Sequence, residues 1–347
     1  MTGKRYPSLS IIIPTLNSER VFQRCLESIF EQDYPEHLVE ILVVDGGSED
    51  ATLETAKEFQ ARRQYTIRVI SNPLKTGEAG KAVGVRHAKN DILAFIDSDN
   101  ILPHESWLQE MVAPFEDQNI VASEPLFYTY RRRDGYINRY CALIGMNDPV
   151  CLFMGNYDRL CSITERWTGL QVLARERGRY LLVRLEGRTL PTIGANGFLI
   201  RRNILTDMAF GEFLFDVDVL PWILEKEKSI QVAKVKTGII HLFCENLTGF
   251  AKKQKRRILD YYRLNVFCNR KVAWPLRKKI GLGIFVLSCV YILPLLWQSL
   301  IGFCRKKDTS WFFHPVACWT TLGVYGFAFM AECFGTRREQ PRVNWTQ

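Results

Sequence analysis

The 347-residue sequence lacks several arrangements that would assign it to other classes of protein. Its ten cysteines include no Cys-x-x-Cys pair, and neither a His-Glu-x-x-His motif nor a Cys/His zinc spacing is present, so zinc modules are not indicated. Scattered cysteines of this kind are typical of buried free thiols in a reducing compartment. The first ten residues contain no apolar core, so we expect no signal peptide and a cytoplasmic location for the main part of the chain.

The sequence also lacks the two commonest nucleotide-binding motifs. The segment around "GEAGKA" is not a Walker loop, because Lys75 stands where the first glycine should be and Ala82 replaces Ser/Thr. The segment "DGGSED" does not extend to the Gly-x-Gly-x-x-Gly of a dinucleotide fold. No internal repeat or low-complexity linker is present.

The net positive charge comes from one part of the chain. The formal net charge is +9, yet residues 249–279 contain eleven Lys or Arg and a single acid, Asp260. The rest of the chain is therefore close to neutral. Nucleic-acid binding needs a broad basic face, so we expect no nucleic-acid partner and interpret 249–279 as a helical segment that lies against anionic lipid headgroups.

Two long apolar stretches follow the basic segment. Residues 280–303 carry no charge, and residues 311–334 carry one acid, Glu332. Each is long enough to span a bilayer, which takes about 20 apolar residues. With short basic loops on either side, they predict a transmembrane hairpin over 280–334, and the positive-inside rule makes the side of 249–279 and of the tail, 335–347, cytoplasmic. The alternative is a pair of buried core helices.

The first 124 residues alternate between apolar strands and helices. Apolar runs at 9–14, 39–45, 65–71 and 91–97 are typical of strands buried on both faces, and their alternation with helices predicts a mostly parallel sheet between helices, an α/β fold. The pattern is lost between 125 and 188, where we expect loops and short helices. A strand is predicted at 197–202, a helix at 217–226 and a strand at 229–235. The expected globular part is 1–248, divided into halves at 124/125.

Aspartates follow two of the predicted strands. Asp45 ends the second, and Asp97 and Asp99 end the fourth. Ligands of parallel sheets bind beyond the carboxyl ends of the strands. Two carboxylates on one turn suit a hard divalent cation, Mg²⁺ or Mn²⁺, that also binds phosphate oxygens; the alternative is a solvated acidic turn.

Four motifs, "SIIIPTLNSE", "VVDGGSED", "GKAVGVRHA" and "FIDSD", resemble in order and spacing the nucleotide-sugar half of family 2 glycosyltransferases with the GT-A fold. The match covers residues 8–124 well and extends more thinly to about 260. The resemblance implies a nucleotide-diphospho-sugar site made of Pro14, Thr15, Asn17, Glu19, Asp45, Gly46, Ser48, Lys81 and Asp97. It also implies a metal held by Asp97 and Asp99. His241 is a possible third ligand, and a structural histidine is the alternative.

Two further segments are similar to the acceptor half of that family. "GANGFLIRR", which contains Asn196, resembles the acceptor loop. "FLFDVDVLPWILEK" resembles the segment that carries the catalytic base, which implies Asp218 as the base and Asp216 as second choice; helix N-capping is the alternative role. "QKRRI" is faintly similar to a motif of processive synthases. Arg256 or Arg257 is expected to bind a diphosphate or lipid phosphate, and a solvated, membrane-facing surface is the alternative.

These features predict an inverting, metal-dependent glycosyltransferase, a hexosyltransferase of the cell membrane with two spans and its catalytic domain on the cytoplasmic face. Its acceptor is expected to be membrane-associated, either a polyprenyl phosphate or a lipid-linked glycan. Two alternatives stay open at this point. One is a processive polysaccharide synthase, and the other is a catalytically silent relative that binds glycan or scaffolds a membrane complex.

Overall fold

The structure is a computed structural model that describes residues 6–62, 64–208, 210–267 and 276–334, with backbone only for 263–267 and 276–279. The predicted tail, 335–347, and part of the basic segment lie outside the described residues. Within these limits the strands are β1 (Leu9–Thr15), β2 (Val39–Asp45), β3 (Thr66–Ser71), β4 (Ile92–Phe95), β5 (Asn100–Ile101), β6 (Ile120–Tyr128), β7 (Leu173–Arg177), β8 (Tyr180–Glu186), β9 (Phe198–Arg201) and β10 (Ser229–His241).

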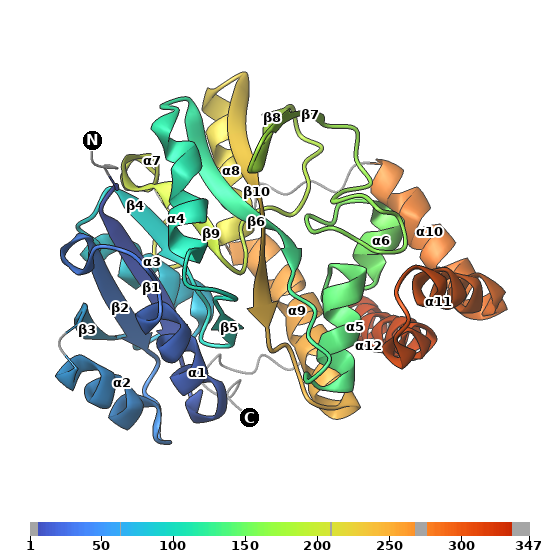
Figure 1. Ribbon diagram of the computed structural model, residues 1–347. Coiled ribbons are helices and arrows are strands. Elements are labelled where there is room, and N and C mark those ends of the chain that lie inside the picture. Colours follow the sequence, from blue (N-terminus) through green and yellow to red (C-terminus); the bar gives the residue numbers. More distant parts are fainter. Residues whose placement is uncertain (1–5, 63, 209, 268–275, 335–347) are drawn as a thin grey trace.

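Helices cover both faces of the sheet and fill the C-terminal quarter (Figure 1). The α-helices are α1 (Glu19–Phe30), α2 (Thr52–Ala61), α3 (Gly77–His87), α4 (Trp107–Val112), α5 (Tyr136–Ile144), α6 (Val150–Met154), α7 (Arg202–Thr206), α8 (Asp216–Lys226), α9 (Leu247–Phe267), α10 (Leu276–Tyr291), α11 (Leu293–Arg305) and α12 (His314–Cys333). The 3₁₀ helices are η1 (Glu36–Leu38), η2 (Ala113–Glu116) and η3 (Thr309–Phe313).

All ten strands of the described chain belong to one mixed sheet in the order β3-β2-β1-β4-β9-β6-β10-β8-β7, with β5 paired to β10. The pairs among β3, β2, β1 and β4 are parallel, which confirms the parallel sheet predicted for the first half. Strand β9 is antiparallel to both β4 and β6. The sheet therefore continues without a break across the predicted boundary at 124/125.

The central strands are buried on both faces because their side chains alternate between two apolar layers. Ile11 and Ile13 of β1 pack with Phe22 of α1, whereas Ile12 packs with helix α3. Helix α3 comes so close that a Cβ at Gly84 would lie 2.3 Å from a methyl of Ile12. Burial of these aliphatic side chains, about 25 cal/mol per Å² of apolar surface, fixes β1 and therefore the loops at its carboxyl end.

The region 125–188 contains more structure than the sequence predicts. Strand β6 extends through Pro125 to Tyr128, and β7 and β8 form a hairpin around Gly178, whose φ is +62°. The expectation of loops and short helices was wrong for these strands. Strand β6 contains a glutamate and a proline, and β7 is exposed throughout, so neither has the apolar pattern on which the prediction depended. The strand predicted at 229–235 continues to His241.

The first apolar stretch is not one straight helix. Helices α10 and α11 meet at Ile292 with an angle of 94° between Ile280–Tyr291 and Leu293–Arg305. Among the described residues one helix, Thr309–Cys333, is long and apolar enough to cross a membrane, or two if the bent pair is taken as one span. In Figure 1 these helices lie beside α5 and α6, on the side of the molecule away from β1–β3.

Candidate active site

A large cavity opens at the carboxyl ends of the parallel strands. Its volume is about 2870 Å³, whereas small-molecule sites usually take about 300–1,000 Å³, so it has room for two substrates. One end is lined by Pro14, Thr15, Asn17, Glu19, Lys81, Asp97 and Asp99. The other end is lined by basic residues of α9 and apolar residues of α10 and α12.

Asp45 does not line this cavity. Its carboxylate is buried and accepts hydrogen bonds from the backbone N–H groups of Gly47 (2.8 Å) and Ser48 (2.9 Å), and from the Ser48 hydroxyl (2.6 Å). Thr15 of the neighbouring strand adds a fourth donor at 3.2 Å. Asp45 thus shapes the turn through Gly46 and Ser48, and this turn joins the first loop, where the Asn17 N–H donates to the Ser48 hydroxyl (2.9 Å).

Lys81 connects two carboxylates in the cavity wall. Its ammonium is 3.4 Å from an oxygen of Asp97 and in direct contact with a carboxylate oxygen of Asp216. The side chains of Lys81 and Asp216 are largely buried, at 10% and 13% exposed. Burial raises the pKa of Asp216; the Lys81 charge opposes this and Asp97 adds to it, so the pKa stays above the ordinary value.

The predicted base, Asp218, is placed differently. It is buried, whereas Asp216 and Val217 line the cavity. The reason is the start of helix α8, since Phe215 is extended and Asp216 is the first helical residue. Two residues further on, the chain has turned about 200° around the axis, which directs position 218 towards the core. Of the two aspartates predicted as the base, Asp216 therefore faces the cavity and Asp218 does not.

Asp99 lies beside two cationic or potentially cationic groups. One of its carboxylate oxygens is 3.3 Å from Nε2 of His241 and 3.2 Å from the ammonium of Lys253 on α9. Burial alone would raise the pKa of Asp99, but His241 and Lys253 hold it well below its ordinary value. Asp99 is therefore ionised over the whole physiological range.

The residues around Asp99 can hold a metal only if a substrate supplies further ligands. In the described part of the chain no group of three or more His, Cys, Asp or Glu side chains is close enough to hold an ion. Asp99 and His241 supply two donor groups side by side. Mg²⁺ typically takes one or two carboxylates and completes its shell with water and phosphate oxygens, so the donor set suits a cation that arrives with a diphosphate.

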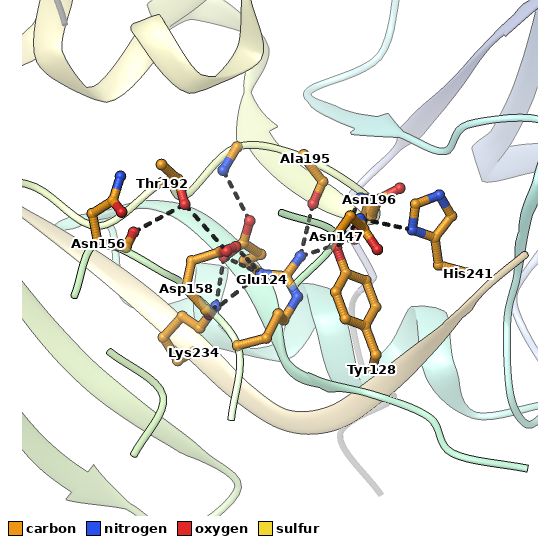
Figure 2. A network of polar contacts seen from close by, with 12 residues as sticks. Glu124, Tyr128, Asn147, Asn156, Asp158, Thr192, Ala195, Asn196, Lys234 and His241 are labelled. Atoms are coloured by element: carbon orange, nitrogen blue, oxygen red, sulfur yellow. Dashed lines mark hydrogen bonds and ion pairs between the residues drawn. The ribbon is translucent and has the colours of Figure 1, made fainter. Parts of the chain in front are cut away.

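A buried network of four charged residues supports the loop of Ala195 and Asn196 (Figure 2). Arg159, Glu124 and Lys234 are fully buried, and a Glu124 oxygen lies 2.5 Å from both cations. Arg159 also contacts Asp158 and donates to the carbonyl oxygens of Ala195 (2.7 Å) and Asn196 (3.1 Å). Burial lowers the pKa of Lys234 to about 8 and raises that of Asp158 to about 6.

This network was not predicted from the sequence. The signal was present as charged residues inside apolar strands, Glu124 in "VASEPLF" and Lys234 in "IQVAKV". Buried charges are kept in such places only when they are paired. The pairing partner, Arg159, comes from a segment without regular structure, so sequence position could not indicate it.

The network fixes Asn196, which was predicted as an acceptor residue. Asn196 has a positive φ of +53°, and its side chain accepts from Asn100 (3.0 Å) and donates to the Tyr128 hydroxyl (3.0 Å). Asn147 bridges the same hydroxyl, at 3.4 Å, and His241 Nδ1, at 3.2 Å. Asn196 is thereby linked through Asn100 to Asp99.

Arg256 and Arg257 line the far part of the cavity. Arg257 donates to the Asn147 carbonyl (3.3 Å) and to Gln254 (2.7 Å), and lies 3.9 Å from Asp148. Arg256 is exposed. Beyond them the wall changes to apolar side chains, Leu282 and Phe285 of α10 and Leu322 of α12.

Comparison with known proteins agrees with this fold. The chain has the GT-A fold: a mannosyltransferase from Pyrobaculum calidifontis, solved with GDP-Man and Mn²⁺, superposes with a TM-score of 0.52 over 99% of this chain and 84% of that chain, at 15% identity. The model of Glycosyl transferase family 2 matches residues 10–207, and the chain belongs to this family of enzymes.

Curated relatives match shorter parts. Glycosyltransferase AglE of Haloferax volcanii is 30% identical over 141 residues, which is 40% of this chain and 46% of that protein. A dolichyl N-acetyl-alpha-D-glucosaminyl phosphate 3-beta-D-2,3-diacetamido-2,3-dideoxy-beta-D-glucuronosyltransferase of Methanococcus voltae is 33% identical over 118 residues, 34% of this chain and 36% of that protein. The matched part is thus less than half of either relative.

Proposed function

We propose that this glycosyltransferase moves a single sugar from a nucleoside-diphospho-sugar to a membrane-associated acceptor, a polyprenyl phosphate or a lipid-linked glycan, with inversion. The observation that carries the proposal is the shape of the cavity. One continuous space joins the carboxylates of Asp97 and Asp99 to a cluster of basic residues and then to apolar helices. A diphosphate, an anionic headgroup and a lipid chain would meet these three surfaces in that order.

The donor would occupy the end of the cavity at β1 and β4. Pro14, Thr15, Asn17 and Glu19 form its wall there, and Asp45 holds the adjoining turn of Gly46 and Ser48. The solved mannosyltransferase contains GDP-Man and Mn²⁺, which supports a nucleotide-sugar donor and a divalent cation for this chain. Asp97, beside Lys81, is the proposed ribose-side carboxylate.

Asp99 and His241 would hold Mg²⁺ or Mn²⁺ together with the diphosphate. A cation bound there stabilises the negative charge that develops on the leaving nucleoside diphosphate. The protein's own contribution is to fix the turn that carries Asp99, since the Leu242 N–H donates to the Asp99 carbonyl at 2.9 Å.

Asp216 is the proposed general base. It lines the same cavity, and its raised pKa lies nearer to neutrality than that of an ordinary aspartate, which favours proton abstraction at physiological pH. With a lipid-linked glycan as acceptor, the Asp216 carboxylate would take the proton of the acceptor hydroxyl as that oxygen attacks the anomeric carbon. The oxygen of a polyprenyl phosphate is already anionic and would need less help from a base. Direct attack opposite the departing diphosphate inverts that carbon. Lys81 would keep Asp216 oriented and ionised before the proton arrives.

The acceptor would enter from the side of α9. Arg256 and Arg257 offer guanidinium groups for phosphate oxygens, and Asn196 presents its backbone loop to the reacting end. The Methanococcus voltae relative is named for a dolichyl-phosphate-linked acceptor, which supports a lipid-linked substrate here. The proposed location is the cell membrane, with the globular part, 1–248, on the cytoplasmic face.

A ligand screen tests this assignment. The purified full chain is heated with nucleoside mono- and diphosphates, each with and without Mn²⁺. We expect stabilisation by a uridine or guanosine diphosphate that depends on Mn²⁺, with little effect from the matching monophosphate, since the second phosphate is what the cation would bind. Stabilisation by no nucleotide, or by mono- and diphosphate equally without metal, would favour a silent relative.

A further inference from the structure

We propose that helices α10, α11 and α12 enter only one leaflet of the membrane and return to the catalytic domain, so that the enzyme is monotopic. This inference rests on the proposed membrane-associated function but is tested independently of sugar transfer. It replaces the two-span hairpin predicted from the sequence, in which residues 305–307 would lie on the far side of the bilayer.

The corner between α10 and α11 is built into the sequence. Pro294 has no N–H to donate and its ring would clash with the carbonyl four residues earlier, so a helix cannot continue through it undistorted. Ile292, two residues before, has a φ of +55°, a conformation that a β-branched residue adopts only where the surrounding structure imposes it. The two arms therefore diverge by 94°.

The far end of α11 is bonded to the catalytic domain. The Arg305 guanidinium donates to the Ser162 carbonyl at 3.0 Å and forms an ion pair with Glu165 at 3.4 Å. Asp308 forms an ion pair with Arg139 at 3.1 Å and also contacts the Tyr130 hydroxyl. These partners all belong to the globular part of the chain, 1–248.

The near end of α10 contacts the same region. A Cβ at Gly281 would lie 2.6 Å from the carbonyl oxygen of Phe153, and the rings of Phe153 and Phe285 meet at 5.3 Å. Both ends of the bent pair thus lie against the segment between α5 and residue 165. A transmembrane hairpin would separate residues 305–308 from this cytoplasmic segment by a hydrocarbon core of about 30 Å, which these contacts do not allow.

Helix α12 also stays with the catalytic domain. Just before it, the Tyr136 hydroxyl donates to the Thr309 carbonyl at 2.7 Å, and at its first residue His314 Nδ1 is 2.7 Å from the Tyr140 hydroxyl. Eleven residues further along, the Tyr325 hydroxyl donates to Asp148 at 2.7 Å. The helix therefore lies along the domain instead of leaving it.

The outer surface of the corner suits the lipid leaflet. Val290, Leu293 and Trp297 are 70%, 71% and 61% exposed, the reverse of what a water-facing corner would show. Exposed basic residues, Lys306 and Lys307, follow α11. An apolar surface with aromatic residues and a basic margin matches a leaflet with anionic headgroups, into which such helices sink about 5–10 Å.

This placement has a consequence for the acceptor. Leu282, Phe285 and Val286 of α10 line the large cavity, whereas other residues of the same helix face outward. The wall of the active-site cavity is therefore made by the element that enters the leaflet. A lipid-linked acceptor could reach Asp216 by moving sideways within the leaflet, without crossing water.

Labelling of one cysteine tests the topology. Lys307→Cys and, as reference, Lys57→Cys on α2 are each introduced into the full chain, and sealed membrane vesicles are treated with a membrane-impermeant maleimide. Peptide mass spectrometry then reports each site. We expect Cys at 307 and at 57 to be labelled from the same side, within about twofold. Labelling at 307 only after the vesicles are opened with detergent, or not at all, would overturn the proposal.

A flotation experiment tests the outer surface. The purified full chain is floated with vesicles of phosphatidylcholine and phosphatidylglycerol. In the double variant Val290→Glu/Leu293→Glu, the fraction bound to vesicles should fall at least tenfold. The control, Leu173→Glu, changes a 67% exposed leucine on β7 and should float like the wild type. Melting curves check that each variant is folded. Unchanged flotation of the folded double variant would overturn the proposal, and a loss of self-association in its place would show that another copy of the chain covers this surface. Glycosyl transfer is measured in neither experiment, so the proposed function stands apart from their outcome.

Discussion

The ammonium of Lys81 lies between the carboxylates of Asp97 and Asp216, 3.4 Å from the first and in contact with the second. One residue comes from α3, one follows β4 and one begins α8. A single cation therefore connects the proposed donor side of the cavity to the proposed base.

The first prediction concerns the identity of the base. Asp216→Asn should lower kcat by about 10²–10⁴-fold, the usual contribution of a general base, and leave the affinity for the donor within a few-fold. Asp218→Asn is the comparison, since it makes the same change two residues away in the buried side of α8. Steady-state transfer rates check this. A larger loss of kcat for Asp218→Asn would restore Asp218 as the base.

The second prediction concerns pH. The base must be ionised, so activity should fall as the pH falls through the raised pKa of Asp216, above the ordinary aspartate value of about 3.9. Lys81 favours the ionised form, so Lys81→Met should raise the pKa of Asp216 further and move the acidic limb of kcat/KM to higher pH. Lys81→Arg should keep the limb near its original position. An acidic limb of kcat/KM that moves by the same amount in Lys81→Met and Lys81→Arg would contradict this role of the Lys81 charge.

The third prediction concerns metal affinity. Lys253 forms an ion pair with Asp99, the proposed metal ligand, at 3.2 Å, and would compete with a cation for it. A partly exposed ion pair is worth up to about 1 kcal/mol, so Lys253→Gln should strengthen Mn²⁺ binding by up to about fivefold in titration calorimetry. Lys252→Gln removes the same charge from an exposed neighbour on α9 and should change it less. Equal effects of the two substitutions on Mn²⁺ binding would indicate that the overall positive charge of α9 matters, and not direct competition by Lys253.

The fourth prediction concerns the buried network. Glu124→Gln leaves Arg159 and Lys234 buried with less compensating charge, and breaking such a group typically costs about 3–5 kcal/mol. The melting temperature should fall clearly. Glu186→Gln, which breaks an exposed ion pair with Arg184, should cost no more than about 1 kcal/mol. A similar small change for both would mean that the network adds little stability.

The sequence predicts the first half of the fold well because β1, β2 and β4 are apolar runs with turn residues after them. The full length of strand β6 was not predicted because Glu124 and Pro125 interrupt its apolar run. Glu124 is nevertheless accommodated in the core, since it pairs with Arg159 and Lys234. The apolar stretch 280–303, predicted as one spanning helix, bends by 94° between α10 and α11. The bend was not predicted because residue composition alone was counted and the backbone preference of Pro294 was not.

The structure brings some of the predicted site residues together and separates others for a similar reason. Asp97, Asp99 and Lys81 follow strands or begin helices whose position the pattern fixes, and the structure brings them to one cavity. Asp216 and Asp218 differ by two positions on a helix, and their roles depend on where α8 begins. Asp45 is held inside the turn that follows it by the backbone N–H groups of Gly47 and Ser48. Side-chain patterns in a sequence do not show such backbone contacts.

The most direct test of the central claim is sugar transfer by the purified full chain. Radiolabelled nucleotide-sugars are incubated with Mn²⁺ and a membrane lipid extract, with wild type and Asp99→Asn side by side. The account predicts label in a lipid-linked product that carries one added sugar, and loss of metal-dependent turnover in Asp99→Asn. Undiminished metal-dependent turnover by Asp99→Asn, or a product that lengthens into a polymer, would contradict it.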